Sequence, residues 1–168
     1  MTAVLKSEII ETFEALHAVF ASFKVQEIDQ VPFEGSWTPG QVGEHILKSI
    51  SNLPRFFNEK TEATHRPYDE KCTQIREIFL DFNTKMKSPE FIVPLEPTHH
   101  QASQLQEFDR IKADMLDAVE HLDLSLTCAS FEMPGLGFLT RMEWLTFFMV
   151  HTQRHVHQLE KILQVMHQ

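Results

Sequence analysis

The sequence predicts an all-α protein, and three observations lead to this fold class. Only five glycines occur, and they fall in two clusters, so long stretches without glycine remain. Apolar residues recur at steps of three and four positions through four of these stretches, which is the spacing of an amphipathic helix. No stretch alternates apolar and polar residues with comparable strength, as a half-buried strand would. Together these patterns predict a four-helix bundle.

The first two predicted helices span about residues 2–24 and 39–58. Thr38 is a suitable N-cap for the second helix, and Pro39 suits its first position, because the missing N–H would have no partner there. Pro54 lies inside the second helix and predicts a kink or a break. The apolar stripe of the first helix consists of Leu5, Ile9, Phe13, Leu16, Phe20 and Phe23.

A long crossover separates the second helix from the third, which spans about residues 102–122. The last helix spans about residues 139–166 and has the strongest apolar pattern. The crossover is roughly forty residues long, against about fifteen for the other two connections, so helices two and three can run parallel. The predicted topology is up-down-down-up within a single domain of residues 1–168. A short accessory helix is expected in the crossover, where a helical period continues through Ile75, Ile78, Phe79, Phe82 and Met86.

Composition and charge exclude several classes of protein. Lys and Arg total 15 against 24 for Asp and Glu, a formal charge of −9, which argues against a nucleic acid or an anionic membrane as partner. The longest strongly apolar run without charge, residues 144–153, is about half of what a bilayer-spanning helix requires. Cys72 and Cys128 are too few for a disulfide framework. The glycines form no phosphate-binding loop, which excludes the usual nucleotide-binding folds. We expect a soluble, cytoplasmic protein.

A pair of histidines, His151 and His155, lies within the apolar stripe of the last predicted helix. Residues four apart share one face of a helix, so both imidazoles can bind one metal ion. They occupy positions between Phe148 and Leu159 where the pattern favours Leu or Ile, and buried imidazoles are costly unless their nitrogens have partners. Ten histidines in this chain make such a pair common by chance. Hydrogen-bonded core residues, or polar residues in a dimer seam, are therefore the alternatives.

His45, on the predicted second helix, is the natural candidate for a third ligand. Three neutral histidines plus water describe an open, catalytic type of metal site, in which the metal lowers the pKa of bound water or activates a thiol. The His151/His155 pair lacks the Glu of HExxH, which argues against the usual metalloprotease. Gln41, one turn before His45, and Glu143, two turns before His151, are candidates to hydrogen-bond the ligands.

The remaining histidines and the tryptophans have structural interpretations. His157 lies two positions from His155 and is expected at the surface, and His99 is expected in a solvated loop flanked by prolines. Trp37 and Trp144 are expected to anchor packing rather than to stack on a ligand.

Two segments resemble motifs of the DinB/YfiT-like superfamily. Residues 36–45 read SWTPGQVGEH, similar to the W-T/S and downstream His that open helix two in that family. Residues 135–159 contain Gly-Leu-Gly, then Glu-Trp, then the histidine pair, similar to its last helix. The resemblance implies an up-down-down-up four-helix bundle with a long crossover. In the family, one histidine of helix two and two of the last helix bind a divalent ion, usually nickel or zinc. Carried over by position, these ligands are His45, His151 and His155.

The resemblance also bears on activity. Some relatives are thiol-dependent transferases or isomerases that use bacillithiol or mycothiol, and others are described as metal-dependent hydrolases. We therefore expect a divalent-metal-dependent enzyme acting on a small molecule, by S-transfer from a low-molecular-weight thiol or, as second choice, by hydrolysis. The crossover, residues 59–100, is expected to shape the pocket.

Two further hypotheses remain open at this stage. The chain could be a non-catalytic helical module that binds a partner or ligand, with a structural or incidental metal site. The family and the apolar content of the first and last helices suggest a homodimer, but an inter-subunit seam and a second core face give the same sequence pattern.

Overall fold

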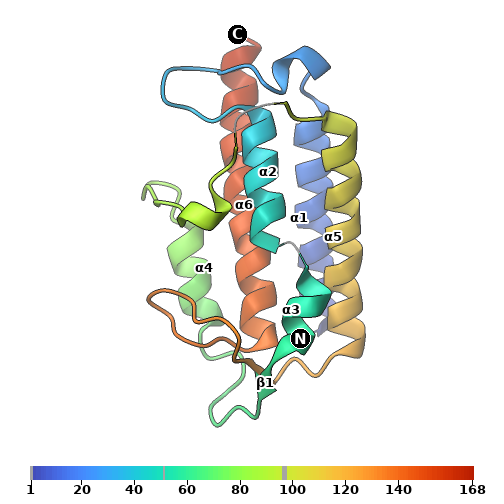
Figure 1. The fold of residues 1–168 in the computed structure, drawn as a ribbon, viewed down its shortest axis with the longest axis vertical. Coiled ribbons are helices and arrows are strands. Elements are labelled where there is room, and N and C mark those ends of the chain that lie inside the picture. Colours follow the sequence, from blue (N-terminus) through green and yellow to red (C-terminus); the bar gives the residue numbers. More distant parts are fainter. Residues whose placement is uncertain (1, 51, 96–97) are drawn as a thin grey trace.

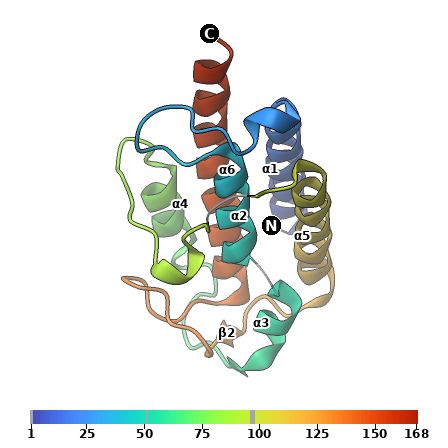
Figure 2. The same ribbon diagram turned by 45° about the horizontal axis from the view of Figure 1, so that its top comes forward.

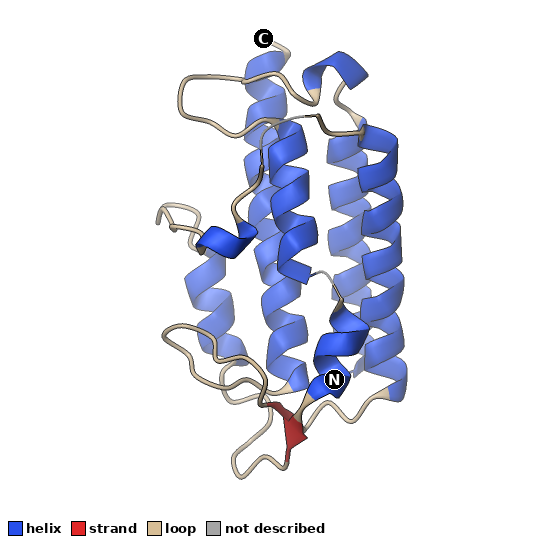
Figure 3. Cartoon of the chain, viewed as in Figure 1, coloured by secondary structure: helices blue, strands red, loops and turns tan. Residues whose placement is uncertain are grey.

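The computed structural model describes residues 2–50, 52–95 and 98–168, and these are mostly helical (Figures 1 and 3). A two-stranded antiparallel sheet, formed by β1 (Thr61–Glu62) and β2 (Thr127–Cys128), pairs Thr61 with Cys128 and Glu62 with Thr127. The predicted all-α class is confirmed. In chain order the elements are α1 (Thr2–Ala21), the 3₁₀ helix η1 (Val25–Glu27), α2 (Pro39–Ile50), α3 (Leu53–Glu59), β1 (Thr61–Glu62), α4 (Cys72–Leu80), the 3₁₀ helix η2 (Glu90–Ile92), α5 (Gln101–His121), β2 (Thr127–Cys128) and α6 (Arg141–Met166).

Four helices, α1, α2, α5 and α6, pack along one another. Both α1 and α2 contact α5 and α6, and α4 packs against the outer side of α6. Figures 1 and 2 show α1 and α6 running toward the end of the molecule that carries the C-terminus, and α2 and α5 running the opposite way. Within the described residues, no helix combines the length and the apolarity that crossing a bilayer requires.

The core follows the predicted stripes. All six apolar residues predicted for the first helix are buried, the last of them, Phe23, just beyond the end of α1. In α6 every residue from 141 to 152 is buried, because α1, α2 and α4 cover this helix from different sides. A helix covered on several sides loses its polar face, so the histidines of α6 are enclosed with the apolar residues around them.

The predicted second helix is two helices, α2 and α3. Thr38 caps α2 as expected, since its Oγ1 accepts from the N–H of Gln41 at 3.1 Å and the Gln41 side chain accepts from the N–H of Thr38 at 3.0 Å. The helical path stops at Ile50 and resumes at Leu53, so that Pro54 sits in the first turn of α3. A proline there lacks only an N–H that would have no partner, whereas a continuous helix would force its ring against the carbonyl four residues earlier. The break predicted at Pro54 is confirmed.

The accessory helix is shorter than its apolar period suggested. α4 ends at Leu80, and Asp81 then accepts from the N–H of Asn83 and the hydroxyl of Thr84, a local turn that competes with further helix. Phe82 and Met86 therefore lie outside the helix, in a segment of residues 81–95 that we call the cover segment. Arg154 of α6 ties its start down by donating to the carbonyls of Phe79 and Asp81.

Candidate metal centre

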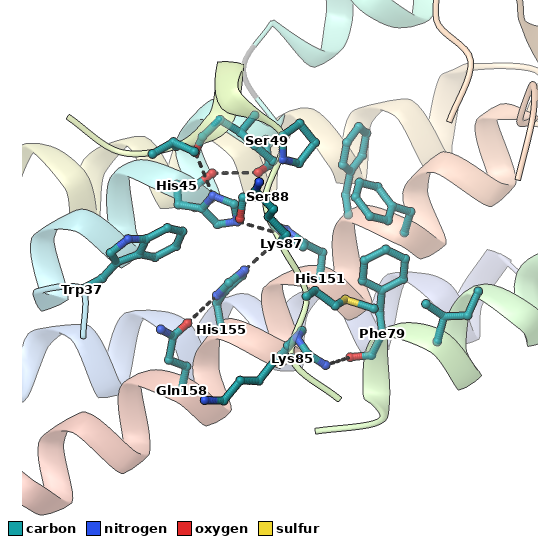
Figure 4. Close-up of a pocket in the computed structure, with 18 of the residues that line it drawn as sticks. Trp37, His45, Ser49, Phe79, Lys85, Lys87, Ser88, His151, His155 and Gln158 are labelled. Atoms are coloured by element: carbon teal, nitrogen blue, oxygen red, sulfur yellow. Dashed lines mark hydrogen bonds between the residues drawn. The ribbon is translucent and has the colours of Figure 1, made fainter. Parts of the chain in front are cut away.

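The structure brings the three predicted ligands together (Figure 4). His45 comes from α2, and His151 and His155 lie one turn apart on α6; their exposed fractions are 1 %, 6 % and 8 %. The Nε2 atom of His151 lies 3.1 Å from Nε2 of His45 and 3.1 Å from Nε2 of His155. One ring nitrogen from each residue lies within 4.8 Å of the other two. Residues 106 positions apart in the chain thus share one small volume.

Two of the three rings are oriented by hydrogen bonds on their far side. Nδ1 of His45 lies 2.8 Å from the backbone carbonyl of Ile92, and Nδ1 of His155 lies 2.8 Å from Oε1 of Gln158. Carbonyl oxygens only accept, so each Nδ1 carries the proton and each Nε2 presents a lone pair. Histidine ligands of metals commonly have such a partner on the second nitrogen, because it fixes the tautomer and the ring orientation.

Without a cation, the two ring nitrogens of His151 cannot both be satisfied by hydrogen bonds. Its Nδ1 is buried without a hydrogen-bond partner among the described residues, and its Nε2 faces the lone pairs of His45 and His155. If His151 carries its proton on Nε2, this one N–H must serve the lone pairs of both His45 and His155, and Nδ1 of His151 has no hydrogen-bond donor. If the proton is on Nδ1 of His151, the Nε2 lone pairs of all three histidines face one another. A cation between the rings accepts all three lone pairs and leaves only one N–H without a partner. The donor set therefore fits a divalent metal ion.

The three imidazoles are neutral at physiological pH. Burial lowers the pKa of His45 and outweighs the hydrogen bond to Ile92. Burial, with the neighbouring His45, lowers the pKa of His155 to about 3, and burial with both neighbouring histidines brings the pKa of His151 well below its usual value. A metal binds only deprotonated imidazole, so neutrality removes competition from protons.

A cavity of about 1170 Å³ opens beside the three histidines. Its walls come from residues 33 and 35–37, from parts of α2 and α3, from parts of α4 and the cover segment, from residues 131 and 133–136, and from part of α6. The crossover therefore contributes one wall, as expected from the sequence. Trp37 and Trp144 pack on neighbouring rings as expected, Trp37 on His45 with ring centres 5.0 Å apart and Trp144 on Phe148 at 5.4 Å. Both also line the cavity.

Gln41 and Glu143 are engaged elsewhere. The Gln41 side chain closes the N-cap of α2 and donates to the carbonyl of Leu95 at 3.3 Å. The Glu143 carboxylate is fully buried, receives two hydrogen bonds from Arg66 at 2.6 and 2.7 Å, and accepts from the N–H groups of Lys71 and Thr140 at 2.9 Å. Both residues occupy the third position of a helix whose N-cap is a Thr, Thr38 for α2 and Thr140 for α6. The pattern T-x-x-Q/E is a capping box, and it was readable in the sequence.

Of two other histidines, His157 meets its expectation and His99 does not. His157 lies at the surface with 35 % of its side chain exposed, and it also lines the cavity and stacks on Phe82 with ring centres 4.2 Å apart. His99 is not solvated: its side chain is 8 % exposed and lies between Asp29 and Glu44, at 2.5 and 2.7 Å. Burial opposes a charge on this ring, but the two carboxylates outweigh it and raise the pKa of His99.

The hydrogen-bond partners of the candidate metal ligands had little or no sequence signal. Gln158 follows His155 by three residues on the same helix, a spacing that brings side chains together but is shared by many surface pairs. The carbonyl of Ile92 is a backbone group in the crossover, so side-chain identity gives no hint of it.

Comparison with known families decides where the chain belongs. The family model of the DinB superfamily matches residues 8–159, most of the sequence and all three histidines. The chain belongs to the DinB superfamily. This confirms the resemblance of residues 36–45 and 135–159. Among individual proteins, the chain is similar to the uncharacterized protein YuaE of Bacillus subtilis (strain 168), with 22 % identity over 138 residues, which cover 82 % of this chain and 83 % of YuaE. No solved structure matches the chain significantly.

Proposed function

We propose that this DinB-superfamily chain is a divalent-metal-dependent enzyme in which His45, His151 and His155 hold Zn²⁺ or Ni²⁺ and the adjoining cavity holds a small-molecule substrate. The favoured reaction is S-transfer from a low-molecular-weight thiol to an electrophile, and hydrolysis is the second choice. The observation that carries the proposal is the convergence of three neutral, buried imidazoles whose Nε2 atoms have no satisfactory arrangement of protons.

The residues of the chain have distinct roles in this proposal. Ile92 and Gln158 hold the rings of His45 and His155 with their Nε2 lone pairs inward. Trp37 and Phe147 pack on the rings of His45 and His151, which limits their rotation and keeps bulk water from those faces. When bound, a divalent ion supplies Lewis acidity that lowers the pKa of water or of a thiol.

The make-up of the cavity favours thiol transfer over hydrolysis. A volume of about 1170 Å³ exceeds the usual range for one small ligand, so a thiol and an electrophile have room together. Among the described residues that line it, none is Asp or Glu, so hydrolysis lacks the carboxylate base that commonly activates water. A thiol whose pKa is lowered by a metal needs no such base.

We also infer that α1, α2, α5 and α6 form the four-helix bundle with up-down-down-up topology that the sequence predicts. The packing of α1 and α2 against α5 and α6, with α1 and α6 opposite in direction to α2 and α5, supports it (Figure 1). In this topology α2 and α6 are antiparallel neighbours, which allows His45 to meet His151 and His155.

The proposed activity is tested by turnover with a chromogenic or fluorogenic electrophile. Zinc- or nickel-loaded protein is mixed with cysteine or coenzyme A as thiol and monochlorobimane as electrophile, where the thiolate sulfur forms a C–S bond and chloride leaves. We expect turnover above the uncatalysed rate, lost in His155→Ala and kept in His121→Ala, an exposed histidine on α5. Equal rates for the wild type and His155→Ala would reject metal-dependent S-transfer.

The alternative is a non-catalytic binding module, which the large apolar cavity would serve equally well. It predicts that His151→Leu/His155→Leu leaves the protein folded, or more stable, with ligand binding intact. The enzyme hypothesis predicts loss of metal and of turnover in the same variant. We further propose that the chain acts on a small molecule, does not bind nucleic acid and forms a homodimer. Light scattering of the purified chain tests the homodimer.

A further inference from the structure

The charged residues that line the cavity are basic, whereas the chain as a whole is acidic. Acidic residues outnumber basic ones by 24 to 15 in the sequence. Among the described residues that line the cavity, the four that carry a full charge are all basic: Lys85, Lys87, Arg154 and Lys161. A random share of the chain's charges would bring mostly carboxylates to this surface.

The three lysines also differ from the other lysines in their pairing. Elsewhere the lysine ammonium groups are engaged: Lys6, Lys24, Lys48, Lys60 and Lys112 form ion pairs, and Lys71 donates to backbone carbonyls. In contrast, Lys85, Lys87 and Lys161 have no carboxylate within 4.0 Å in the part of the chain that the structure describes. All three are exposed, so their charge is available to a ligand at the cavity mouth.

The positions of these lysines relate them to the candidate metal centre. Lys85 and Lys87 lie on the cover segment, which runs beside the three histidines in Figure 4 and whose Ile92 carbonyl accepts a hydrogen bond from His45. Lys161 lies on α6, six residues and nearly two turns beyond His155. Arg154 is different, because its guanidinium donates to the carbonyls of Phe79 and Asp81 and so holds the cover segment in place.

The remaining surface of the cavity is mainly apolar and aromatic. Both tryptophans and most of the phenylalanines of the chain line it. Several of these are exposed, among them Phe33, Phe82, Phe91 and Phe131, at 51 %, 41 %, 66 % and 38 %. A cluster of exposed aromatic side chains at a cavity marks a surface that a ligand covers.

From these observations we propose that the cavity takes a bulky, largely apolar molecule that carries a negative charge. Its apolar body packs on the aromatic lining, and its anionic group lies near Lys85, Lys87 and Lys161. This deepens the proposed function by giving the substrate class, and it rests on that function in treating the bound molecule as substrate. An anion is favoured over a neutral or cationic molecule because its charge is complementary to that of the three lysines.

Two fluorescent probes with the same aromatic body isolate the charge. 1-Anilinonaphthalene-8-sulfonate is N-phenyl-1-naphthylamine with one added sulfonate, and both brighten in apolar sites. Their Kd values are measured for the wild type, for Lys85→Gln/Lys87→Gln/Lys161→Gln, and for Lys24→Gln/Lys60→Gln/Lys112→Gln. The second triple variant removes the same three charges from lysines outside the cavity, so it controls for net charge.

We expect the cavity triple variant to weaken the sulfonate by about tenfold, since three exposed charges each contribute a modest amount. The neutral amine should change by less than about twofold in either variant, and the control variant should hold both probes like the wild type. The proposal is overturned if the sulfonate keeps its wild-type Kd in the cavity variant, if both probes weaken equally, or if the control variant loses the sulfonate as strongly.

Zinc uptake by the same preparations separates this inference from the proposed function. Protein that binds zinc but shows no lysine-dependent preference for the sulfonate contradicts the substrate class alone. Protein that shows the preference but takes up neither zinc nor nickel contradicts the proposed function, and the recognition of an apolar anion by these lysines stands.

Discussion

The buried carboxylate of Glu143 allows a prediction of stability from the structure. It is 0 % exposed and accepts four hydrogen bonds: two from Arg66, one from the N–H of Lys71 and one from the N–H of Thr140. These bonds join the start of α6 to the loop before α4. Glu143→Ala leaves the Arg66 guanidinium and two backbone donors without their acceptor.

The magnitude follows from the groups that are left unpaired. Removing one partner of a buried ion pair costs about 3–5 kcal/mol, and loss of a capping interaction about 1 kcal/mol. Arg66 is 23 % exposed and regains some hydration, so we place the total near 4 kcal/mol. For a chain of this size that corresponds to a fall in Tm of about 8–16 °C.

Urea unfolding followed by circular dichroism measures this change directly. Glu62→Ala serves as control, because Glu62 is 61 % exposed and its pairing with Lys60 at 3.5 Å is that of a surface pair. The control should change the free energy of unfolding by less than about 0.5 kcal/mol. A loss below about 1 kcal/mol for Glu143→Ala would refute the assignment of Glu143 as the structural anchor of α6.

Three other predictions test further parts of the account. Burial raises the pKa of Glu143, but Arg66 and the backbone donors outweigh burial and lower that pKa. The stability advantage of the wild type over Glu143→Ala should therefore be complete above about pH 4.3 and shrink as the pH falls below it. An advantage that persists unchanged into acid would contradict this. Gln158→Met removes the acceptor for Nδ1 of His155 and should weaken zinc binding by about tenfold in competition with a chromophoric chelator, and unchanged affinity would argue against this orienting role. Gly43→Ala should lower the free energy of unfolding by about 1–3 kcal/mol, because its Cβ would lie 2.8 Å from Nε2 of Gln104 and 3.1 Å from the ring of Phe20; an unchanged or higher Tm would show that α2 has room to shift.

The features that the sequence predicts well are those with a local, repeated signal. The stripe of α1, the continuous pattern of α6 and the cap at Thr38 each depend on residues a few positions apart, and each was found as expected. The break before Pro54 follows from the chemistry of proline. The pairing of His151 and His155 on one face follows from helical spacing. His45 was a candidate from its place on the predicted second helix, and the family resemblance supported it as the third ligand.

The features that the sequence predicts poorly depend on the tertiary path of the crossover. The turn at Asp81 ends α4 early, and the cover segment that follows lines the same cavity as the histidines, which makes Lys85 and Lys87 cavity residues. His99 meets Asp29 and Glu44 from distant parts of the chain, so no local pattern announces its burial. Glu143 was misassigned for a different reason: its spacing to His151 suggested a role at the metal, while the nearer capping pattern decided its place.

Metal stoichiometry is the measurement that tests the central proposal most directly. Untagged protein is purified without metal resin, because three histidines take up nickel from such resins, and its metal content is determined by elemental analysis for the wild type and His45→Ala. We predict about one equivalent of a divalent metal in the wild type and its loss in His45→Ala. No metal in the wild type, together with no tight uptake of added Zn²⁺ or Ni²⁺, would contradict the account and favour a binding module with three histidines in its core.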